Sequence, residues 1–202
     1  MKHPKPKVLL SACIEHSAVR FDATMISSSE VKGMIQYFDF ITVCPEMAIG
    51  MPAPRDTIRI VQGEEDLRLL SSIEGNDYTD KMRAFSKKYL TSLSEKSIDG
   101  AILKAKSPTC GTDKIKIYKG TGKSQPLGTT QNGFFAEEVV NNYTDYPIET
   151  ERRLSNFTIR ENFFIRVFTT ARFKYISDNS MKNLVNFHST HKYLFMSYNQ
   201  NT

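Results

Sequence analysis

The stretch Val43-Cys44-Pro45-Glu46 closes an apolar run, and this run predicts a buried strand that ends at a cysteine. Two other short apolar runs lead to cysteines in the same way: residues 8–10 precede Cys13, and residues 101–103 precede Cys110. The chain contains three cysteines, so each of them follows a predicted strand. If these strands lie side by side in a parallel sheet, we expect the three sulfurs to meet at its carboxyl edge, where such sheets bind ligands.

Helical patterns separate the predicted strands. Ser27-Ser28-Ser29-Glu30 resembles a capping box with Ser27 as N-cap, and apolar residues follow at helical spacing as far as Phe38. Further helices are predicted from Asp77 or Thr79 to about Ser94, and over Phe134 to Asn142. This order predicts an α/β fold, in which a parallel sheet is flanked by helices and followed by a short all-helical C-terminal segment.

Two weaker strand patterns lie between the main elements. Residues 58–61 predict a short edge strand, and Lys114 to Tyr118 alternate as an exposed hairpin or edge strand would. Residues 44–56 hold three prolines and a glycine, which predicts a stiff loop without regular structure.

The last quarter of the chain differs in kind. One helix is predicted from Glu151 to about Ile176 and another from the Ser180 cap to about Tyr198, with a break at Ser177-Asp178-Asn179. Residues 1–150 hold 19 basic and 19 acidic side chains, whereas residues 151–202 hold 8 and 3 and so carry the whole net charge of +5. We expect an α/β domain with a three-cysteine site over 1–150 and a basic helical segment, a partial C-terminal domain, over 151–202. The excess of basic residues in this segment suggests that it binds a polyanion such as RNA. The alternative is that these residues only form a solvated helix face.

Composition excludes several classes of protein. No apolar run approaches the roughly 18 residues of a membrane span, and the basic N-terminus leads into a run too short for a signal peptide. An odd number of widely spaced cysteines is a poor disulfide scaffold and favours reduced thiols. We expect a cytoplasmic protein with no membrane partner.

Two motif-like stretches do not support a site. Gly120-Thr121-Gly122-Lys123-Ser124 lacks the earlier glycine of a P-loop, and Pro126 prevents the helix that would receive a phosphate. His188 and His191 have no third ligand at helical spacing, so we interpret them as part of a helix surface or a packing contact.

The cysteines admit three interpretations. They can be small side chains that fill packing sites at strand ends. They can hold zinc with His16 as fourth ligand, because Cys13 and His16 have usable spacing. They can instead hold an iron–sulfur cluster in which one iron lacks a protein ligand. Spacing alone does not separate these possibilities.

A family resemblance bears on the choice. The chain resembles the thiouracil desulfidase family over about residues 7–145, in Ser11-Ala12-Cys13, Val19-Arg20-Phe21-Asp22, Val43-Cys44-Pro45-Glu46, Gly50-Met51-Pro52-Ala53-Pro54-Arg55, Ile102-Leu103-Lys104, Lys106-Ser107-Pro108-Thr109-Cys110-Gly111, Ile117-Tyr118 and Gly120. The resemblance implies a 4Fe-4S cluster on Cys13, Cys44 and Cys110, with one iron not bound by the protein. It also implies a thiolated pyrimidine substrate whose sulfur is replaced by oxygen.

Residues 160–198 resemble the start of a domain fused behind this one in longer members. Those fusions are implicated in removing sulfur from thiolated uridines in tRNA, which makes tRNA a candidate partner of the basic segment. Two departures matter: Ile14-Glu15-His16 replaces an apolar pair and glycine, and the second domain is shorter than usual.

The implied chemistry needs a general acid or base beside the cluster. The candidate is Glu46, which lies two residues beyond a cysteine in a stiff loop. The alternative role of Glu46 is structural: its carboxylate can accept backbone N–H bonds in the turn. Ser107 can hydrogen-bond the pyrimidine or the attacking water, and its alternative is a turn cap. Substrate contacts are expected from Ser11 and Thr109 and from Arg20 with Asp22, although that last pair can equally be structural.

The sequence therefore predicts an iron–sulfur-dependent desulfidase that acts on free thiouracil or on thiouridine in tRNA. The alternative function is a non-catalytic RNA-binding module with a structural zinc site. A third possibility is a degenerate site, because residues 14–16 depart from the family pattern.

Overall fold

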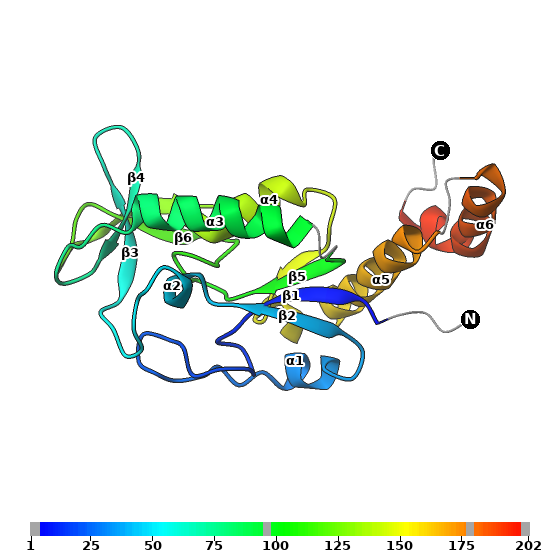
Figure 1. The fold of residues 1–202 in the computed structure, drawn as a ribbon, viewed down its shortest axis with the longest axis horizontal. Coiled ribbons are helices and arrows are strands. Elements are labelled where there is room, and N and C mark those ends of the chain that lie inside the picture. Colours follow the sequence, from blue (N-terminus) through cyan, green and yellow to red (C-terminus); the bar gives the residue numbers. More distant parts are fainter. Residues whose placement is uncertain (1–4, 95–97, 177–179, 199–202) are drawn as a thin grey trace.

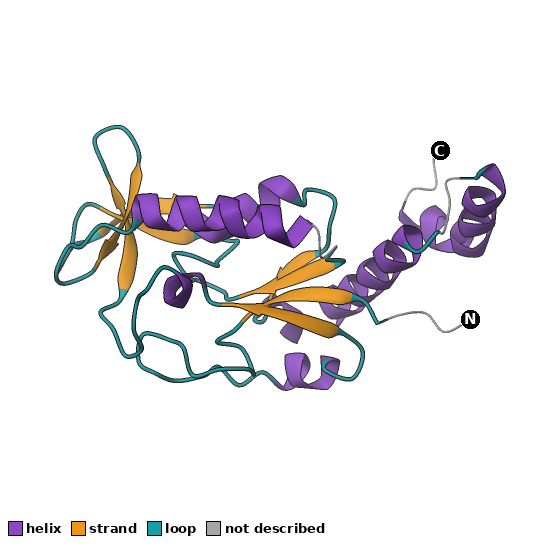
Figure 2. Ribbon diagram, in the orientation of Figure 1, coloured by secondary structure: helices purple, strands orange, loops and turns teal. Residues whose placement is uncertain are grey.

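The computed structural model describes residues 5–94, 98–176 and 180–198, which form two four-stranded sheets with helices packed on them (Figures 1 and 2). The elements in chain order are β1 (Lys7–Ser11), α1 (Ser29–Met34), β2 (Asp39–Val43), α2 (Pro45–Ala48), β3 (Ile58–Gln62), β4 (Leu67–Ser71), α3 (Thr79–Ser94), β5 (Gly100–Leu103), β6 (Ile115–Tyr118), β7 (Pro126–Thr130), α4 (Phe134–Asn142), β8 (Ile148–Thr150), the 3-10 helix η1 (Arg153–Ser155), α5 (Phe157–Lys174) and α6 (Met181–Tyr198).

The first sheet has the order β2-β1-β5-β8, and every neighbouring pair in it is parallel. The three apolar runs that precede the cysteines form β1, β2 and β5, as predicted. All four residues of β5 are buried, which is typical of a parallel strand covered on both faces. The predicted α/β fold with a helix-flanked parallel sheet is therefore confirmed.

Alternate residues of β1 supply the two cores of this sheet. Leu9 packs with residues of α3 and α4, whereas Val8 and Leu10 pack with residues of α1 and α5. Side chains of successive strand residues point to opposite faces, so one apolar run serves both layers. Figure 1 shows α3 and α4 on one side of the β1, β2 and β5 ribbons and α1 on the other.

The second sheet has the order β4-β3-β6-β7. The strand predicted over residues 58–61 exists, but the prediction that it is an edge strand was wrong, because β3 pairs with β4 on one side and with β6 on the other. One partner, residues 67–71, follows in a hairpin, and the other, residues 115–118, lies far along the chain. The second pairing makes β3 an inner strand, and such long-range pairing leaves no mark on the local pattern. The predicted hairpin after Lys114 is present as β6 and β7.

Strand β8 was not predicted. It contains three residues and pairs with β5 through Ala101, Ile102 and Leu103. A three-residue strand is too short to show a period of two, so the neighbouring strand decides its conformation.

Helix α1 begins one residue later than predicted and is shorter. The N-cap is Ser28 rather than Ser27, because the Ser28 hydroxyl accepts the Val31 N–H at 3.3 Å. The helix ends at Met34, whose carbonyl accepts N–H bonds from both Tyr37 and Phe38 in a closing turn. Helix α3 ends at Ser94 and α4 spans residues 134–142, as predicted.

The two C-terminal helices pack differently. The predicted first helix begins at Phe157 rather than Glu151, after η1, and the Asn156 side chain caps it. Buried Phe163 and Val167 join α5 to the core of the first sheet, whereas His191 is the buried side chain of α6. The predicted break at 177–179 lies outside the described residues, and the division of the chain at residue 150 remains a prediction. None of the helices in the described part of the chain is long and apolar enough to cross a membrane.

Candidate active site

A cavity of about 270 Å³ opens beyond the carboxyl ends of β1, β2 and β5. The loops that follow these three strands line it, together with the start of β3. Cys13, Cys44 and Cys110 all line this cavity, and all three are free thiols. Their role as metal ligands remains a prediction, but the topology brings residues that are far apart in the sequence to one place.

The three thiols lie in an environment that disfavours their charged form. Burial is the main cause, and it raises the pKa of Cys13 from 9.0 to about 12 and also raises the pKa of Cys44 and of Cys110. A thiolate at Cys44 is a smaller cause of the raised pKa of Cys13, and thiolates at Cys13 and Cys44 are smaller causes of the raised pKa of Cys110. A hydrogen bond with the Ser11 side chain acts in the opposite direction on Cys110. A metal centre bound here must therefore displace protons from these sulfurs.

The donor set does not fit a single metal ion. Within residues 5–94, 98–176 and 180–198, no group of three or more His, Cys, Asp or Glu side chains is placed to hold one ion. His16, the predicted fourth zinc ligand, is absent from the residues that line the cavity and lies in a separate hollow beside Glu15 and Phe38. Three thiols around one cavity are the donor set that an iron–sulfur cluster on three cysteines needs, and their role as its ligands remains a prediction.

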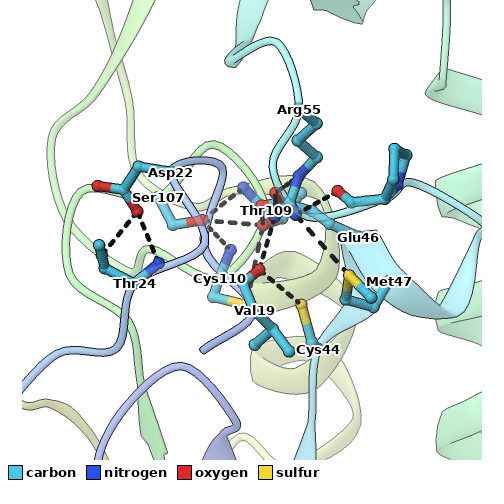
Figure 3. Close-up of polar contacts among 11 residues, drawn as sticks. Val19, Asp22, Thr24, Cys44, Glu46, Met47, Arg55, Ser107, Thr109 and Cys110 are labelled. Atoms are coloured by element: carbon cyan, nitrogen blue, oxygen red, sulfur yellow. Dashed lines mark hydrogen bonds and ion pairs between the residues drawn. The ribbon is translucent and has the colours of Figure 1, made fainter. Parts of the chain in front are cut away.

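Glu46 lies in α2, two residues beyond Cys44, and lines the cavity. Its Oε2 accepts an N–H from Arg55 Nε at 3.0 Å and another from Arg55 Nη2, and its Oε1 accepts the Thr109 hydroxyl at 2.8 Å (Figure 3). The sequence suggested backbone N–H donors as the alternative role of this carboxylate. The structure shows instead that a guanidinium and a hydroxyl orient it.

Ser107 also lines the cavity, and its hydroxyl closes a turn. Its Oγ accepts the backbone N–H groups of Thr109 at 3.2 Å and of Cys110 at 3.1 Å. It also lies 2.8 Å from Thr109 Oγ1. Because the Thr109 hydroxyl donates to Glu46, the hydrogen shared by the two hydroxyls belongs to Ser107. A directed chain of donors thus runs from Ser107 through Thr109 to Glu46.

The four predicted substrate-binding residues occupy different depths. Ser11 lines the cavity and accepts the Lys104 N–H at 3.0 Å, and Arg20 lines it and pairs with Asp22 at 3.3 Å. Asp22 is absent from the cavity lining, and a hydrogen bond from the Thr24 side chain is the main cause that lowers its pKa. Thr109 is fully buried behind the lining. Substrate contacts by these residues remain predictions, and the geometry gives Asp22 and Thr109 supporting positions.

Sequence reasoning missed three charged residues of this region. Arg55 was quoted in the family pattern without a role, although an arginine in a proline-stiffened loop after Cys44 was a usable signal. Lys104 lines the cavity, and its Nζ lies 2.6 Å from Glu151 Oε1. Glu151 also accepts the Ala105 N–H at 2.7 Å. Nothing local in the sequence signals that Glu151, far along the chain, belongs beside this cavity.

Comparison with known proteins gives three findings. A family model described as 2-thiouracil desulfurase matches residues 8–151. Uncharacterized protein YbbK of Bacillus subtilis (strain 168) is 28% identical over 119 residues, which are 56% of this chain and 78% of the relative. A solved structure described as the [4Fe-4S]-dependent thiouracil desulfidase TudS aligns with a TM-score of 0.59 and 24% identity, over 78% of this chain and 99% of that one. The structural likeness shows a shared fold.

Proposed function

The chain belongs to the 2-thiouracil desulfurase family, and from this premise we propose that it replaces the sulfur of a thiolated uracil with oxygen and releases sulfide. The observation that carries the proposal is one cavity lined by all three cysteines together with Glu46 and Ser107. The region matched by the family model contains every one of these residues. The overall reaction consumes one water and yields uracil and hydrogen sulfide, with no net gain or loss of electrons.

The proposed cofactor is a 4Fe-4S cluster held by Cys13, Cys44 and Cys110, with one iron left without a protein ligand. Support comes from the donor set, since the chain has three cysteines and all three line the cavity. When bound, such a cluster supplies an iron atom that accepts a soft sulfur ligand and polarises the thiocarbonyl group. Reduced thiols fit the cytoplasm, which we propose as the compartment.

The side chains around the cavity have complementary parts in this reaction. Glu46 Oε1 accepts a proton from the attacking water, and the donor chain through Thr109 and Ser107 fixes that oxygen in place. Lys104 presents a cation to the same cavity, and its charge lowers the pKa of Cys13. That charge favours the negative charge that develops as sulfur departs.

The physiological form of the substrate is part of the proposal. The basic segment 151–202 favours thiouridine in RNA, including tRNA, because its excess of cations suits a phosphate backbone. Free thiouracil needs the cavity alone. A comparison of the two substrates therefore tests the role of the segment.

The experiment is reconstitution without oxygen, followed by iron analysis and an assay for sulfide. We expect about four iron atoms per chain and sulfide release from 2-thiouracil, from thiolated tRNA or from both. Absence of sulfide from both substrates with an intact cluster contradicts the proposal. About one zinc per chain without iron would favour the RNA-binding alternative.

A further inference from the structure

We propose that Arg55 is a positioning residue of this active site, which holds the Glu46 carboxylate in place and ties together the loops that carry the cysteines. The inference rests on the proposed function, because it gives Arg55 a part in that reaction. Arg55 follows α2 in the proline-containing loop, and its side chain is only 5% exposed although it lines the cavity.

The guanidinium of Arg55 uses its donors in three directions. Nε and Nη2 both donate to Glu46 Oε2, Nη2 also donates to the Val19 carbonyl at 3.0 Å, and Nη1 donates to the Pro52 carbonyl at 2.9 Å (Figure 3). A planar fork with five N–H donors can satisfy these acceptors together. The single ammonium of a lysine cannot reach all three.

These contacts join the loops of two cysteines. Val19 belongs to the loop that follows β1 and contains Cys13, whereas Glu46 lies two residues beyond Cys44 in α2. The backbone N–H of Arg55 also donates to the Phe21 carbonyl at 2.8 Å, in the same loop as Val19. The Val19 carbonyl lies 4.0 Å from Cys44 Sγ, so the first loop reaches both the arginine and a thiol.

The third cysteine loop reaches the same carboxylate from the other side. Thr109 precedes Cys110, and its hydroxyl donates to Glu46 Oε1 at 2.8 Å. One carboxylate therefore accepts from Arg55 on one oxygen and from Thr109 on the other, and the side chain of Glu46 is only 15% exposed. Removal of the Arg55 side chain would leave Glu46 held on one side. It would also remove the bond to the Val19 carbonyl that helps to join the loop of Cys13 to α2, and the bonds made by the backbone would remain between them.

The test compares Arg55→Ala and Arg55→Lys with Arg68→Ala. Arg68 is a matched control, because it also pairs with a carboxylate, Asp77, but lies outside the cavity lining. The first readout needs no substrate: it is the rate at which the reconstituted cluster loses iron to a chelator. Residues that support metal ligands typically change affinity or activity by about 10- to 100-fold. We expect iron loss to accelerate by about tenfold in both Arg55 variants and to stay unchanged in Arg68→Ala.

The second readout separates positioning from general stability. We expect kcat to fall by about 100-fold in Arg55→Ala while KM changes little, because displacement of a reacting group by about 1 Å has that effect. Guanidinium ion added at low millimolar concentration should restore part of kcat in Arg55→Ala, whereas urea, which has a similar shape without the charge, should not. Arg55→Lys should recover less than a tenth of wild-type kcat.

The proposal is overturned if Arg55→Lys equals the wild type in both readouts, or if Arg55→Ala keeps its iron and kcat as Arg68→Ala does. If Arg55→Ala does not fold, Arg55→Gln is measured in its place against the same limits. A wild-type protein that keeps its cluster but releases no sulfide would end the proposed function alone. The rate of iron loss would still decide whether Arg55 ties the cysteine loops together.

Discussion

Two ion pairs border the same cavity, and they are built differently. In the first, Glu46 and Arg55 both line the cavity, and Arg55 holds the Glu46 carboxylate. In the second, Lys104 lines the cavity, whereas its partner Glu151 is absent from the lining and is buried. Both members of the first pair thus line the cavity, whereas only the lysine of the second pair does.

The pKa of Cys13 depends on the charges of both pairs. The charge of Lys104 lowers its pKa, whereas the charges of Glu46 and Glu151 raise it. The comparison teaches that two ion pairs beside one cavity differ according to whether one partner or both partners line it. We propose that Glu46 takes part in proton transfer, and that Lys104 with Glu151 sets the charge of the cavity and stabilises the fold.

The largest expected effect comes from removal of one of the three thiols that line the cavity. Cys110→Ser should lose its cluster and with it sulfide release by more than about 100-fold, beyond the range seen for residues that only support ligands. Iron content and sulfide assays measure this. Ser92→Ala, an exposed change in α3, is the control. A fully loaded Cys110→Ser protein would remove the assigned ligand.

The next effect separates the two carboxylates. Glu46→Gln should lower kcat per bound cluster by about 10²- to 10⁴-fold, because general acid–base catalysis contributes that much. Glu151→Gln should lower it by less than about tenfold, since Glu151 does not reach the cavity. Rates normalised to iron content decide the matter, and equal losses in the two variants would erase the distinction between the pairs.

The third effect is on the stability of the fold, and here Glu151 rather than Glu46 is the carboxylate of interest. Glu151→Gln weakens the bonds from Lys104 and from the Ala105 N–H to a buried side chain, at a cost of about 1–3 kcal/mol. For a chain of this size, that corresponds to a fall in Tm of about 2–12 °C. Thermal melting of the cluster-free protein measures the change. An unchanged Tm would show that this pair does not stabilise the fold.

The smallest effect is on the reactivity of Cys13. With its pKa raised to about 12, this thiol remains protonated at neutral pH, so its alkylation should accelerate by about tenfold per pH unit from pH 9 to 11. In the unfolded chain, with a pKa of 9.0, the rate should level off soon above pH 9. Mass spectrometry of cluster-free protein treated with iodoacetamide gives both curves.

The same assay sharpens the comparison through two variants. Lys104→Met removes a charge that lowers the pKa of Cys13 and should slow alkylation, whereas Glu46→Gln removes a charge that raises it and should speed alkylation. Shifts in the same direction would mean that Lys104 and Glu46 do not move the pKa of Cys13 in opposite directions.

The elements that the sequence predicted well are those with long or strongly periodic patterns. The apolar runs of β1, β2 and β5 and the helices α3 and α4 were predicted, because burial of an apolar face dictates their spacing. The inner position of β3 and the existence of β8 were missed. Both follow from pairing with strands far along the chain, which short segments do not encode.

For the site, the sequence suggested candidate residues for the chemistry but not how they are held. Glu46 and Ser107 were chosen because they lie close to cysteines in stiff turns, and both line the cavity. The interactions that hold the lining residues were not foreseen. Thr109, which donates to Glu46, is 63 positions away from it, and Glu151, which pairs with Lys104, is 47 positions away from it.

By itself, the sequence determined the three strands that precede the cysteines, the principal helices and the family to which the chain belongs. The tertiary structure alone decided which charge meets which, that Glu46 is held by Arg55 and Thr109, and that His16 stays apart from the thiols. The physical reason is the distance along the chain over which each kind of interaction acts. Propensity and periodicity act within a few residues, whereas a hydrogen bond or an ion pair depends on distances in space that only the completed sheets and loops define.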